Sequence, residues 1–469
     1  MTEVRDPRTG RVERLLAPPS PERLRELVAG LRAAQPAWLA LGTDGRAAAL
    51  HAWADELAAA AEPLTAALLA DTGRQYESAM EAGQVVAMAR RWADAAGDLL
   101  TPVTMPSRVV PGIALETGPR PYPLVGVISP WNFPLLLGLI DAIPALAAGC
   151  AVIVKPSEVT PRFIAPLRDT ILRVPALRDV VRVVEGAGDV GAALIPMVDA
   201  VCFTGSVPTG RLVGAAAAAV FIPAFLELGG KDPAIVLPGT DLERASSALL
   251  WGAVANAGQS CLSIERIYVH KSIADELVRL LIAKADQVTL AWPEPGDGML
   301  GPLIDPVQAG IIEAQLADAV AKGATVHSGG VIEEHGGGRW IRPTVLTGVS
   351  QDMAIMQEET FGPILPVATF DTVEQAVALA NDSAFGLSGA VFGPDEEAAA
   401  AVARRLDVGA VSINDAALTA LIHEGEKNSF RGSGLGGSRM GAASIRRFVR
   451  KQTLITNHSP TRDPWWHTP

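Results

Sequence analysis

Apolar residues recur at helical spacing through the first hundred positions. Alanine and leucine lie three or four residues apart in segments 21–35, 47–61 and 80–99, with glutamate and arginine between them, which is the pattern of amphipathic helices. At residues 109–122, prolines and glycines interrupt short apolar runs. Such punctuation favours an exposed hairpin over a buried core. We therefore predict three helices and then a hairpin that protrudes from the body of the protein.

Two series of short apolar runs follow, and each alternates with helical segments. Because strands that alternate with helices form parallel sheets, we predict an α/β fold with two sheets and a cleft between them. Open sheets of this kind bind ligands at the carboxyl ends of their strands. The first series has predicted strands at 125–129, 151–155, 181–185 and 201–204. The second has predicted strands at 234–237, 266–270, 390–392 and 410–414, with helices at 241–257, 274–290, 373–381 and 396–406.

Composition and charge narrow the possible partners. The chain has 469 residues, of which 49% are hydrophobic and 19% charged, and its formal net charge is -12. An acidic chain lacks the concentrated positive surface that nucleic acids and anionic membranes require. Its long apolar runs, such as 135–140 and 146–154, end well before the length that spans a bilayer. We therefore expect a small-molecule substrate, no nucleic acid and no membrane.

The N-terminus and the cysteines indicate a reducing compartment. The first residues lack a basic segment followed by an apolar one, so they do not resemble a secretory signal. The three cysteines are odd in number and widely spaced, which does not fit a disulfide framework. We expect a cytoplasmic protein with free thiols.

Cys261 is the cysteine whose surroundings favour chemistry. Cys150 and Cys202 lie in apolar runs, where a buried, inert thiol is expected. Cys261 follows Asn256-Ala-Gly-Gln-Ser at the end of an apolar helical segment, and the exposed amides of such a turn can stabilise a thiolate. From this context alone, a structural surface cysteine is an equally good interpretation.

Glu227 is a candidate general base. It lies in the segment Leu226-Glu-Leu-Gly-Gly-Lys231, between apolar neighbours and a pair of glycines. A carboxylate in a cleft of this kind can accept a proton from a reacting group. A structural carboxylate paired with Lys231 fits the same segment equally well.

Three segments that follow predicted strands could hold a dinucleotide. Gly186-Ala-Gly188-Asp-Val-Gly191 is a weak glycine pattern that could also serve only to turn the chain. Phe203-Thr-Gly205-Ser206 precedes the next helical segment. Lys155-Pro-Ser157-Glu158 offers a cation and a carboxylate to ribose hydroxyls, although a solvated turn would look the same. A carboxylate at that point favours NAD because it would repel a 2′-phosphate.

The sequence offers little support for a metal site or for a serine hydrolase. The seven histidines are scattered, and neither His-x-x-x-His nor Cys-x-x-Cys spacing occurs, so no metal site is predicted. The Gly-x-Ser-x-Gly pattern of serine hydrolases is also missing from the sequence.

Taken together, these segments resemble the aldehyde dehydrogenase superfamily over essentially the whole chain. The resemblance is specific because seven motifs occur in the order and spacing of that family. It implies a non-acylating, NAD(P)-dependent enzyme that oxidises an aldehyde to a carboxylic acid. The motifs are Pro130-Trp-Asn-Phe-Pro134, Lys155-Pro-Ser-Glu158, Phe203-Thr-Gly-Ser206, Glu227-Leu-Gly-Gly-Lys231, Gly258-Gln-Ser-Cys261, Glu358-Glu-Thr-Phe-Gly-Pro363 and Asn381 with Gly386-Leu-Ser388.

The resemblance also implies the catalytic roles. Cys261 would attack the aldehyde carbonyl as a thiolate. The side-chain amide of Asn132 and the backbone N–H of Cys261 would form the oxyanion hole. Glu227 would activate the water that hydrolyses the resulting thioester, because neutral water attacks a thioester slowly.

A set of cofactor-binding residues follows by the same resemblance. Lys155 and Glu158 would bind the adenosine ribose, and Ser206, at the start of a predicted helix, would meet the pyrophosphate. Glu359 and Phe361 would hold the nicotinamide ribose and ring. NAD is expected, with NADP as the alternative. The implied set is Ile128, Ser129, Trp131, Lys155, Ser157, Glu158, Gly188, Gly205, Ser206, Thr209, Leu228, Glu359 and Phe361.

The resemblance implies three structural parts. Residues 1–107 and 123–230 would form a Rossmann-like NAD-binding domain, and 231–415 a second α/β domain that carries the nucleophile. Residues 416–444 would return to the cofactor domain and border the substrate entrance. Residues 108–122 and 445–469 would form a small β arm for oligomerisation, with Trp465 and Trp466 covered by a partner subunit. A homodimer or homotetramer is expected.

One stretch departs from the family pattern. Where the family carries Phe-Gly-Gly-x-Lys-x-Ser-Gly, residues 428–439 read Asn-Ser-Phe-Arg-Gly-Ser-Gly-Leu-Gly-Gly-Ser-Arg. Because this stretch and residues 415–425 would border the substrate entrance, the departure bears on specificity. Arg431 could bind a carboxylate there, which would favour a semialdehyde.

The residues expected at the entrance are otherwise aliphatic. Leu137 and Ile140 follow Asn132, while Leu418 and Leu421 lie in the late loop, so we predict a tunnel for a hydrophobic aldehyde. Alternatives are a semialdehyde-specific relative, a CoA-acylating relative and a catalytically silent binding homologue. Glu227 favours water as the acyl acceptor.

Overall fold

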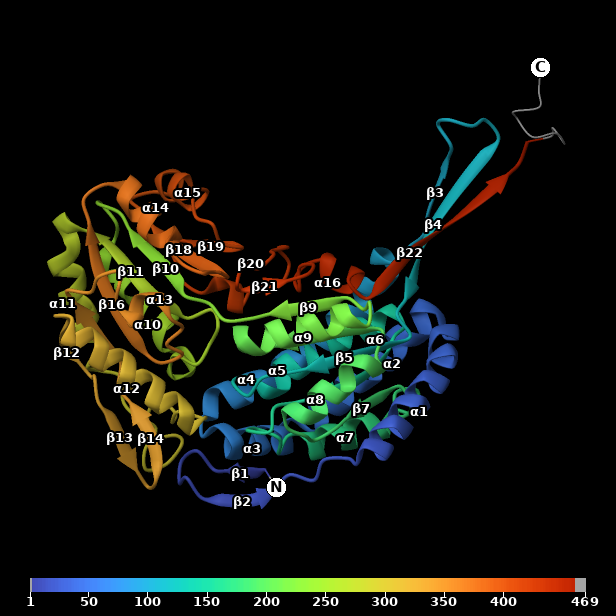
Figure 1. The fold of residues 1–469 in the computed structure, drawn as a ribbon, viewed down its shortest axis with the longest axis horizontal. Coiled ribbons are helices and arrows are strands. Elements are labelled where there is room, and N and C mark those ends of the chain that lie inside the picture. Colours follow the sequence, from blue (N-terminus) through green and yellow to red (C-terminus); the bar gives the residue numbers. More distant parts are fainter. Residues whose placement is uncertain (1, 460–469) are drawn as a thin grey trace.

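A computed structural model describes residues 2–459. Two α/β bodies lie next to each other, and a thin β arm projects from one of them (Figure 1). The chain first builds most of one body, crosses to the second after residue 227, and returns near its end to add a strand to the first. The predicted α/β class with two mainly parallel sheets is confirmed.

Four helices, not the three predicted, precede the first parallel strand. Ser20 caps the first of them by accepting a hydrogen bond from the Arg23 N–H, and Gly73, at φ +69°, ends the third. A short antiparallel pair precedes the helices. The elements are β1 (Glu3–Arg5), β2 (Val12–Leu15), α1 (Pro21–Ala40), α2 (Gly42–Ala59), α3 (Ala61–Thr72) and α4 (Gln75–Leu99).

The first sheet has six strands in the order β21-β9-β8-β5-β6-β7, parallel except for β21. Its central strands are buried along their whole length, which explains their continuous apolar runs. The strands are β5 (Leu124–Ile128), β6 (Ala151–Lys155), β7 (Val181–Val183), β8 (Ala200–Thr204), β9 (Ala224–Glu227) and β21 (Gly434–Leu435). The helices between them are α5 (Pro134–Leu139), α6 (Ala142–Ala148), α7 (Ile164–Arg173), α8 (Gly188–Leu194) and α9 (Val207–Ala219).

The second sheet has seven strands in the order β12-β15-β16-β11-β10-β18-β19, and only β12 runs antiparallel to its neighbour. Along β10, Ala234 and Val236 join one apolar cluster and Ile235 joins the cluster on the opposite face. The strands are β10 (Asp232–Val236), β11 (Ile264–His270), β12 (Thr325–Ser328), β15 (Thr344–Thr347), β16 (Ile364–Phe370), β18 (Ser388–Phe392) and β19 (Ala410–Ile413).

The helices of this body cover both faces of the sheet. Leu249 and Leu277 of α10 and α11 lie in one apolar cluster, whereas Ile312, Ala376 and Ala399 of α12, α14 and α15 lie in the other. The helices are α10 (Leu242–Val254), α11 (Ala274–Ala285), α12 (Pro306–Ala321), α13 (Ala354–Gln357), α14 (Val373–Asn381) and α15 (Glu396–Ala403). Smaller elements are β13 (Ile332–His335), β14 (Gly338–Ile341), β17 (Phe385–Gly386), β20 (Phe430–Arg431) and α16 (Ala443–Arg446).

Some predicted boundaries were wrong. The helix predicted over 241–257 ends at Val254, because Asn256 and Ala257 adopt positive φ angles of 56° and 52°. The helix predicted over 274–290 ends at Ala285. β9, which carries Glu227, and the elements between residues 306 and 370 were not predicted.

The arm is a three-stranded antiparallel sheet in the order β22-β4-β3, formed by β3 (Val103–Pro106), β4 (Ile113–Pro121) and β22 (Val449–Asn457). It extends away from both bodies (Figure 1), and nearly all of β22 is exposed. The strand expected over 453–456 is thus longer than predicted. Trp465 and Trp466 lie outside the described residues, and the domain boundaries given above stay predictions.

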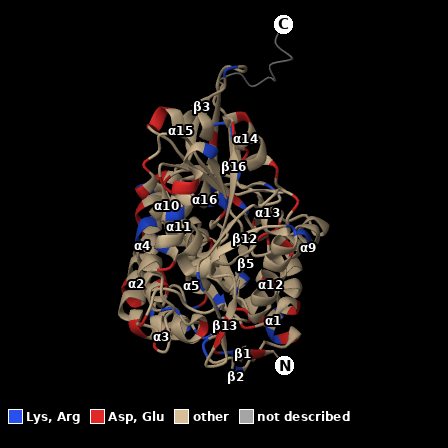
Figure 2. Cartoon of the chain, turned by 90° about the vertical axis from the view of Figure 1, so that its left-hand side faces the viewer, with Lys and Arg blue, Asp and Glu red and all other residues tan. Residues whose placement is uncertain are grey.

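Along the ribbon in Figure 2, Lys and Arg positions are interspersed with Asp and Glu positions. Among residues 2–459, no helix is both long and apolar enough to cross a membrane.

Candidate functional site

Cys261 lies on a tight turn between α10 and β11. Asn256, Ala257 and Gly258 before it all have positive φ angles, of 56°, 52° and 71°. A Cβ on Gly258 would lie 2.2 Å from the carbonyl oxygen of Gly362, so only glycine fits there. This left-handed run ends the helix and turns the cysteine into the region between the two bodies, where its residue is half-buried.

Two buried amide side chains hold this turn. The Gln259 carboxamide donates to the carbonyl oxygens of Asn256, at 3.1 Å, and Pro302, at 3.2 Å, and accepts from the Ile304 N–H at 2.8 Å. Asn256 Nδ2 donates to the Gln259 carbonyl oxygen at 2.9 Å. The cysteine backbone is therefore positioned by long-range contacts, which the sequence analysis did not identify.

Asn132 reaches the same turn from the other body. Its Nδ2 donates to the carbonyl oxygen of Gln259 at 3.0 Å, and the residue is 3% exposed. A carboxamide nitrogen carries two N–H donors, so one remains for another acceptor. Within residues 2–459, the Cys261 N–H also has no hydrogen-bond acceptor. Two N–H donors, one on Asn132 and one on the Cys261 backbone, are thus left without an acceptor at this turn among residues 2–459.

The surroundings of the Cys261 thiol disfavour its ionised form. Burial raises its pKa to about 12. The positive charge of Lys427 opposes this rise, whereas the negative charges of Glu359, Asp232 and Glu227 add to it.

The other two cysteines lie in the core of the first body. Cys150 and Cys202 are completely buried and free. Burial raises the pKa of each thiol far above its usual range, and neither residue belongs to the turn that holds Cys261. Their sequence interpretation as buried free thiols is confirmed.

Glu227 ends β9, at the crossing between the two bodies. Its Oε2 accepts a hydrogen bond from Ser429 Oγ at 2.8 Å. The alternative pairing with Lys231 does not occur, because Lys231 Nζ donates to Glu265 Oε2 and to Thr360 Oγ1, both at 2.8 Å. Glu227 therefore forms no ion pair with Lys231, and it is half-buried.

The two glycines after Glu227, Gly229 and Gly230, let the backbone come close to Glu359 and to Cys261. A Cβ on Gly230 would lie 2.3 Å from the Cys261 carbonyl oxygen, and one on Gly229 would lie 2.5 Å from Glu359 Oε2. The Gly230 N–H donates to Glu359 Oε1 at 3.1 Å. Burial, followed by the nearby charge of Glu265, raises the pKa of Glu359 to about 8.

Phe361 and Trp131 meet across the two bodies. Their ring centroids lie 5.4 Å apart in an edge-to-face arrangement. Phe361 has a positive φ of 53°, and its N–H donates to Glu265 Oε1 at 2.8 Å. Glu265, which the sequence analysis did not select, therefore fixes both Lys231 and the backbone next to Glu359.

The carboxyl ends of β6 and β8 carry the predicted cofactor segments. Lys155, 3% exposed, donates to Glu158 Oε2 at 3.2 Å, and Ser157 Oγ accepts from the Val159 N–H. Ser206 precedes α9 but makes no capping hydrogen bond; its hydroxyl donates instead to Thr209 Oγ1 at 3.1 Å.

These features fit a dinucleotide. The first-turn N–H groups of α9 remain available to an anion, and Lys155 and Glu158 offer a donor and an acceptor to ribose hydroxyls at the neighbouring strand end. Gly205 and Leu228 lie close to the same helix: the Leu228 side chain fills the space above Gly210.

Two residues of the predicted cofactor set, Gly188 and Ser129, have surroundings that do not point to a ligand. Gly188 is exposed at the start of α8, with open space around the position of a Cβ. It is Gly191 that packs against Ile128 and Lys155. Ser129 Oγ is buried, without a hydrogen-bond partner, and faces Gly138 of α5.

The atypical stretch is ordered by contacts to both bodies. β20 pairs with β17, and β21 pairs with β9, so that Gly434 lies opposite Glu227. Arg431, suggested above as a carboxylate ligand, donates to Asp407 Oδ2 at 2.6 Å and to the Ser383 carbonyl oxygen at 2.6 Å. It is therefore already engaged within the protein.

The predicted entrance residues are accessible to different degrees. Leu137 and Ile140 of the α5 region and Leu418 of the late loop are half-buried, and Leu421 is 49% exposed.

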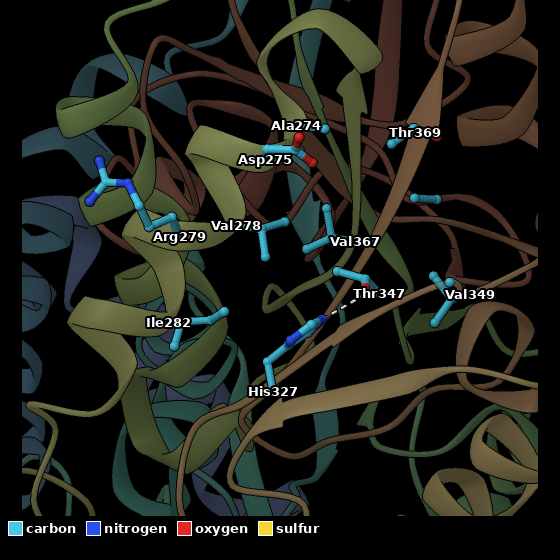
Figure 3. A pocket seen from close by; sticks show the side chains of 12 residues that line it. Ala274, Asp275, Val278, Arg279, Ile282, His327, Thr347, Val349, Val367 and Thr369 are labelled. Carbon is cyan, nitrogen blue, oxygen red and sulfur yellow. Dashed lines mark hydrogen bonds between the residues drawn. The ribbon is translucent and has the colours of Figure 1, made fainter.

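A separate cavity of about 460 Å³ lies on the second body, between α11 and the strands β12, β15 and β16. Figure 3 shows that Arg279 points away from it and that His327 contacts Thr347, with a hydrogen bond of 2.7 Å. None of the predicted catalytic residues lines it. Over the described part of the chain, no cluster of three or more potential metal ligands occurs.

Comparisons with known proteins show the family of the chain. The sequence model of the aldehyde dehydrogenase family matches residues 1–454. A relative from Mycolicibacterium smegmatis, named "Putative succinate-semialdehyde dehydrogenase (NADP+)", is 36% identical over 92% of this chain and 84% of its own.

Two solved structures are similar over nearly all of the chain. PutA from Anabaena variabilis, described as a putative aldehyde dehydrogenase, has a TM-score of 0.98 and 55% identity, covering 99% of both chains. Betaine aldehyde dehydrogenase from Staphylococcus aureus, in complex with NAD+, has a TM-score of 0.93 and 30% identity, covering 99% of this chain and 93% of its own. The chain is therefore a member of the aldehyde dehydrogenase family, enzymes that oxidise aldehydes with NAD(P).

Proposed function

We propose that this enzyme oxidises an uncharged, apolar aldehyde to the carboxylic acid, with Cys261 as nucleophile, Asn132 in the oxyanion hole and Glu227 as the base for hydrolysis. The observation that carries this proposal is the Cys261 turn. Asn132 from the first body binds the turn through one N–H and keeps a second N–H for an oxyanion. The Cys261 N–H, which has no acceptor among residues 2–459, is the other donor.

In the first half of the reaction, the sulfur of Cys261 forms a bond to the carbonyl carbon, and the thiol proton leaves to water. The carbonyl oxygen becomes an oxyanion, which the N–H groups of Asn132 and Cys261 stabilise. When bound, NAD(P) supplies the hydride acceptor. Loss of the hydride leaves the carbon as a thioester of Cys261.

In the second half, Glu227 takes a proton from water as the water oxygen attacks the thioester carbon. The carbon–sulfur bond then breaks, the acid leaves, and the thiolate sulfur takes up the proton that Glu227 holds. A base contributes about 10²- to 10⁴-fold to such steps. Glu227 favours water over CoA as the acceptor of the acyl group, because a base is needed to activate water for hydrolysis of the thioester.

For the cofactor, we propose that Lys155, Ser157 and Glu158 hold the adenosine ribose and that the start of α9, with Gly205, Ser206 and Thr209, holds the pyrophosphate. Ile128, Ser129, Trp131, Gly188, Leu228, Glu359 and Phe361 complete the proposed set. Because Glu158 offers a carboxylate to the ribose, NAD is favoured over NADP. The relatives named above include both an NADP+ and an NAD+ protein.

The substrate preference rests on the aliphatic, partly accessible Leu137, Ile140, Leu418 and Leu421. A carboxylated aldehyde is a second candidate substrate, because its carboxylate could pair with the positive charge of Lys427. This lysine is half-buried, makes no ion pair within residues 2–459, and acts on Cys261 through its charge. The relative named for succinate semialdehyde supports the same alternative.

The exposed arm supports a homodimer or homotetramer, since an edge strand such as β22 is suited to pairing with another subunit. The free cysteines support a cytoplasmic location.

The test is NADH formation at 340 nm with medium-chain alkanals, aromatic aldehydes and succinate semialdehyde, with NAD and with NADP. We expect Cys261→Ala to abolish turnover and a medium-chain alkanal to give the highest kcat/KM. A higher kcat/KM for succinate semialdehyde would replace the apolar substrate by the carboxylated one. A requirement for CoA, or silence across the whole panel, would refute the hydrolytic dehydrogenase.

A further inference from the structure

The stretch that departs from the family pattern also supplies a hydrogen bond to the proposed base. Ser429 Oγ donates to Glu227 Oε2 at 2.8 Å. No other side chain of residues 2–459 hydrogen-bonds to this carboxylate. The two residues are 202 positions apart in the chain, so the contact exists only because the late segment returns to the first sheet.

The backbone around Ser429 is paired with strands of both bodies. Phe430 lies opposite Gly386 in the β17–β20 pair, which belongs to the second body. Gly434 lies opposite Glu227 in the β9–β21 pair, and the Ser433 carbonyl oxygen accepts the Leu228 N–H at 2.8 Å. The segment from Ser429 to Gly434 therefore bridges the two bodies directly beside Glu227.

This anchoring limits where the hydroxyl can go. The Ser433 hydroxyl accepts the Gly386 N–H at 2.9 Å and is completely buried, and a Cβ on Gly434 would lie 2.7 Å from Ser429 Cβ. Ser429 is thus a preorganised donor, and Glu227 is half-buried next to it. A hydrogen bond from a hydroxyl to an ionised carboxylate is stronger than a hydrogen bond between two neutral groups.

We propose that Ser429 is a positioning residue that holds the Glu227 carboxylate in the orientation from which it activates water for hydrolysis of the thioester. This inference rests on the proposed function. It concerns deacylation alone: a water oxygen bonds to the acyl carbon, Glu227 takes the proton, and the carbon–sulfur bond to Cys261 breaks. Ser429 takes no part in the earlier attack by sulfur.

The experiment separates the two half-reactions in the full-length enzyme with NAD and the best aldehyde of the panel. Rapid mixing gives the rate constant of the first NADH equivalent. Acid quenching followed by intact mass measurement gives the fraction of enzyme that carries an acyl group on Cys261, and hence the deacylation rate constant. The variants are Ser429→Ala, Ser429→Thr, which keeps a hydroxyl, and Ser438→Ala.

Ser438 is the matched control because it lies in the same stretch, and its hydroxyl binds Lys427 N, Met440 N and the Met440 carbonyl oxygen instead of Glu227. We expect Ser429→Ala to slow deacylation about tenfold, or about 1.4 kcal/mol. The first-turnover rate should stay within about twofold of wild type, and the acyl-enzyme should accumulate. Ser429→Thr should restore most of the loss, and Ser438→Ala should leave deacylation unchanged.

The proposal is overturned if Ser429→Ala deacylates at the wild-type rate, if it slows both half-reactions equally, or if Ser438→Ala reproduces its effect. A wild-type enzyme that oxidises no aldehyde would instead refute the proposed function. The unchanged first-turnover rate also shows that the variant is folded.

Discussion

Replacing Asn132 by alanine tests the oxyanion hole with little disturbance of the fold. Asn132 Nδ2 donates to the Gln259 carbonyl oxygen at 3.0 Å, but Asn256 Nδ2 donates to the same oxygen at 2.9 Å. The carbonyl therefore keeps a partner in Asn132→Ala, and the cost in stability should be about 1 kcal/mol, the net value of one hydrogen bond. The second N–H of Asn132 has no such replacement.

Loss of that donor should lower kcat about a hundred- to a thousandfold, or about 2.7 to 4 kcal/mol of transition-state stabilisation. The assay is NADH formation at saturating aldehyde and NAD, together with thermal unfolding of both proteins. A kcat within about threefold of wild type, with an unchanged melting temperature, would refute the role of Asn132. A large fall in melting temperature would show instead that the side chain is needed to hold the Cys261 turn.

Three further changes test other parts of the site. Lys427→Met should slow alkylation of Cys261 by iodoacetamide, because removal of the positive charge raises the thiol pKa further. In wild type, the alkylation rate should rise about tenfold per pH unit from pH 7 to 10, since the pKa of about 12 lies above this range; a plateau near pH 8 would contradict this. Lys231→Met should destabilise the protein by about 3 to 5 kcal/mol in urea unfolding, because it leaves Glu265 buried without its cation. Glu158→Gln should narrow the ratio of kcat/KM for NAD over NADP at least severalfold, whereas an unchanged ratio would remove Glu158 from the ribose site.

The sequence alone determined the class of fold and the nature of the chemistry. Strands such as 151–155 are buried on both faces of a parallel sheet, so each appears as a continuous apolar run, and helix 373–381 has the expected periodicity. Cys261 was separated from Cys150 and Cys202 by its local polar, glycine-containing context. These features are local, and they can be found without knowing which distant residues will meet.

Only the tertiary structure decided the partners of the reactive groups. It paired Lys231 with Glu265 rather than with Glu227, engaged Arg431 with Asp407, and brought Ser429 to Glu227. The strands that follow Ser429 and anchor its segment, β20 and β21, have only two residues each, too few to show any periodicity. Hydrogen bonds between residues so far apart depend on strand order and on the return of the chain to the first sheet, and no local pattern of apolar and polar positions encodes either.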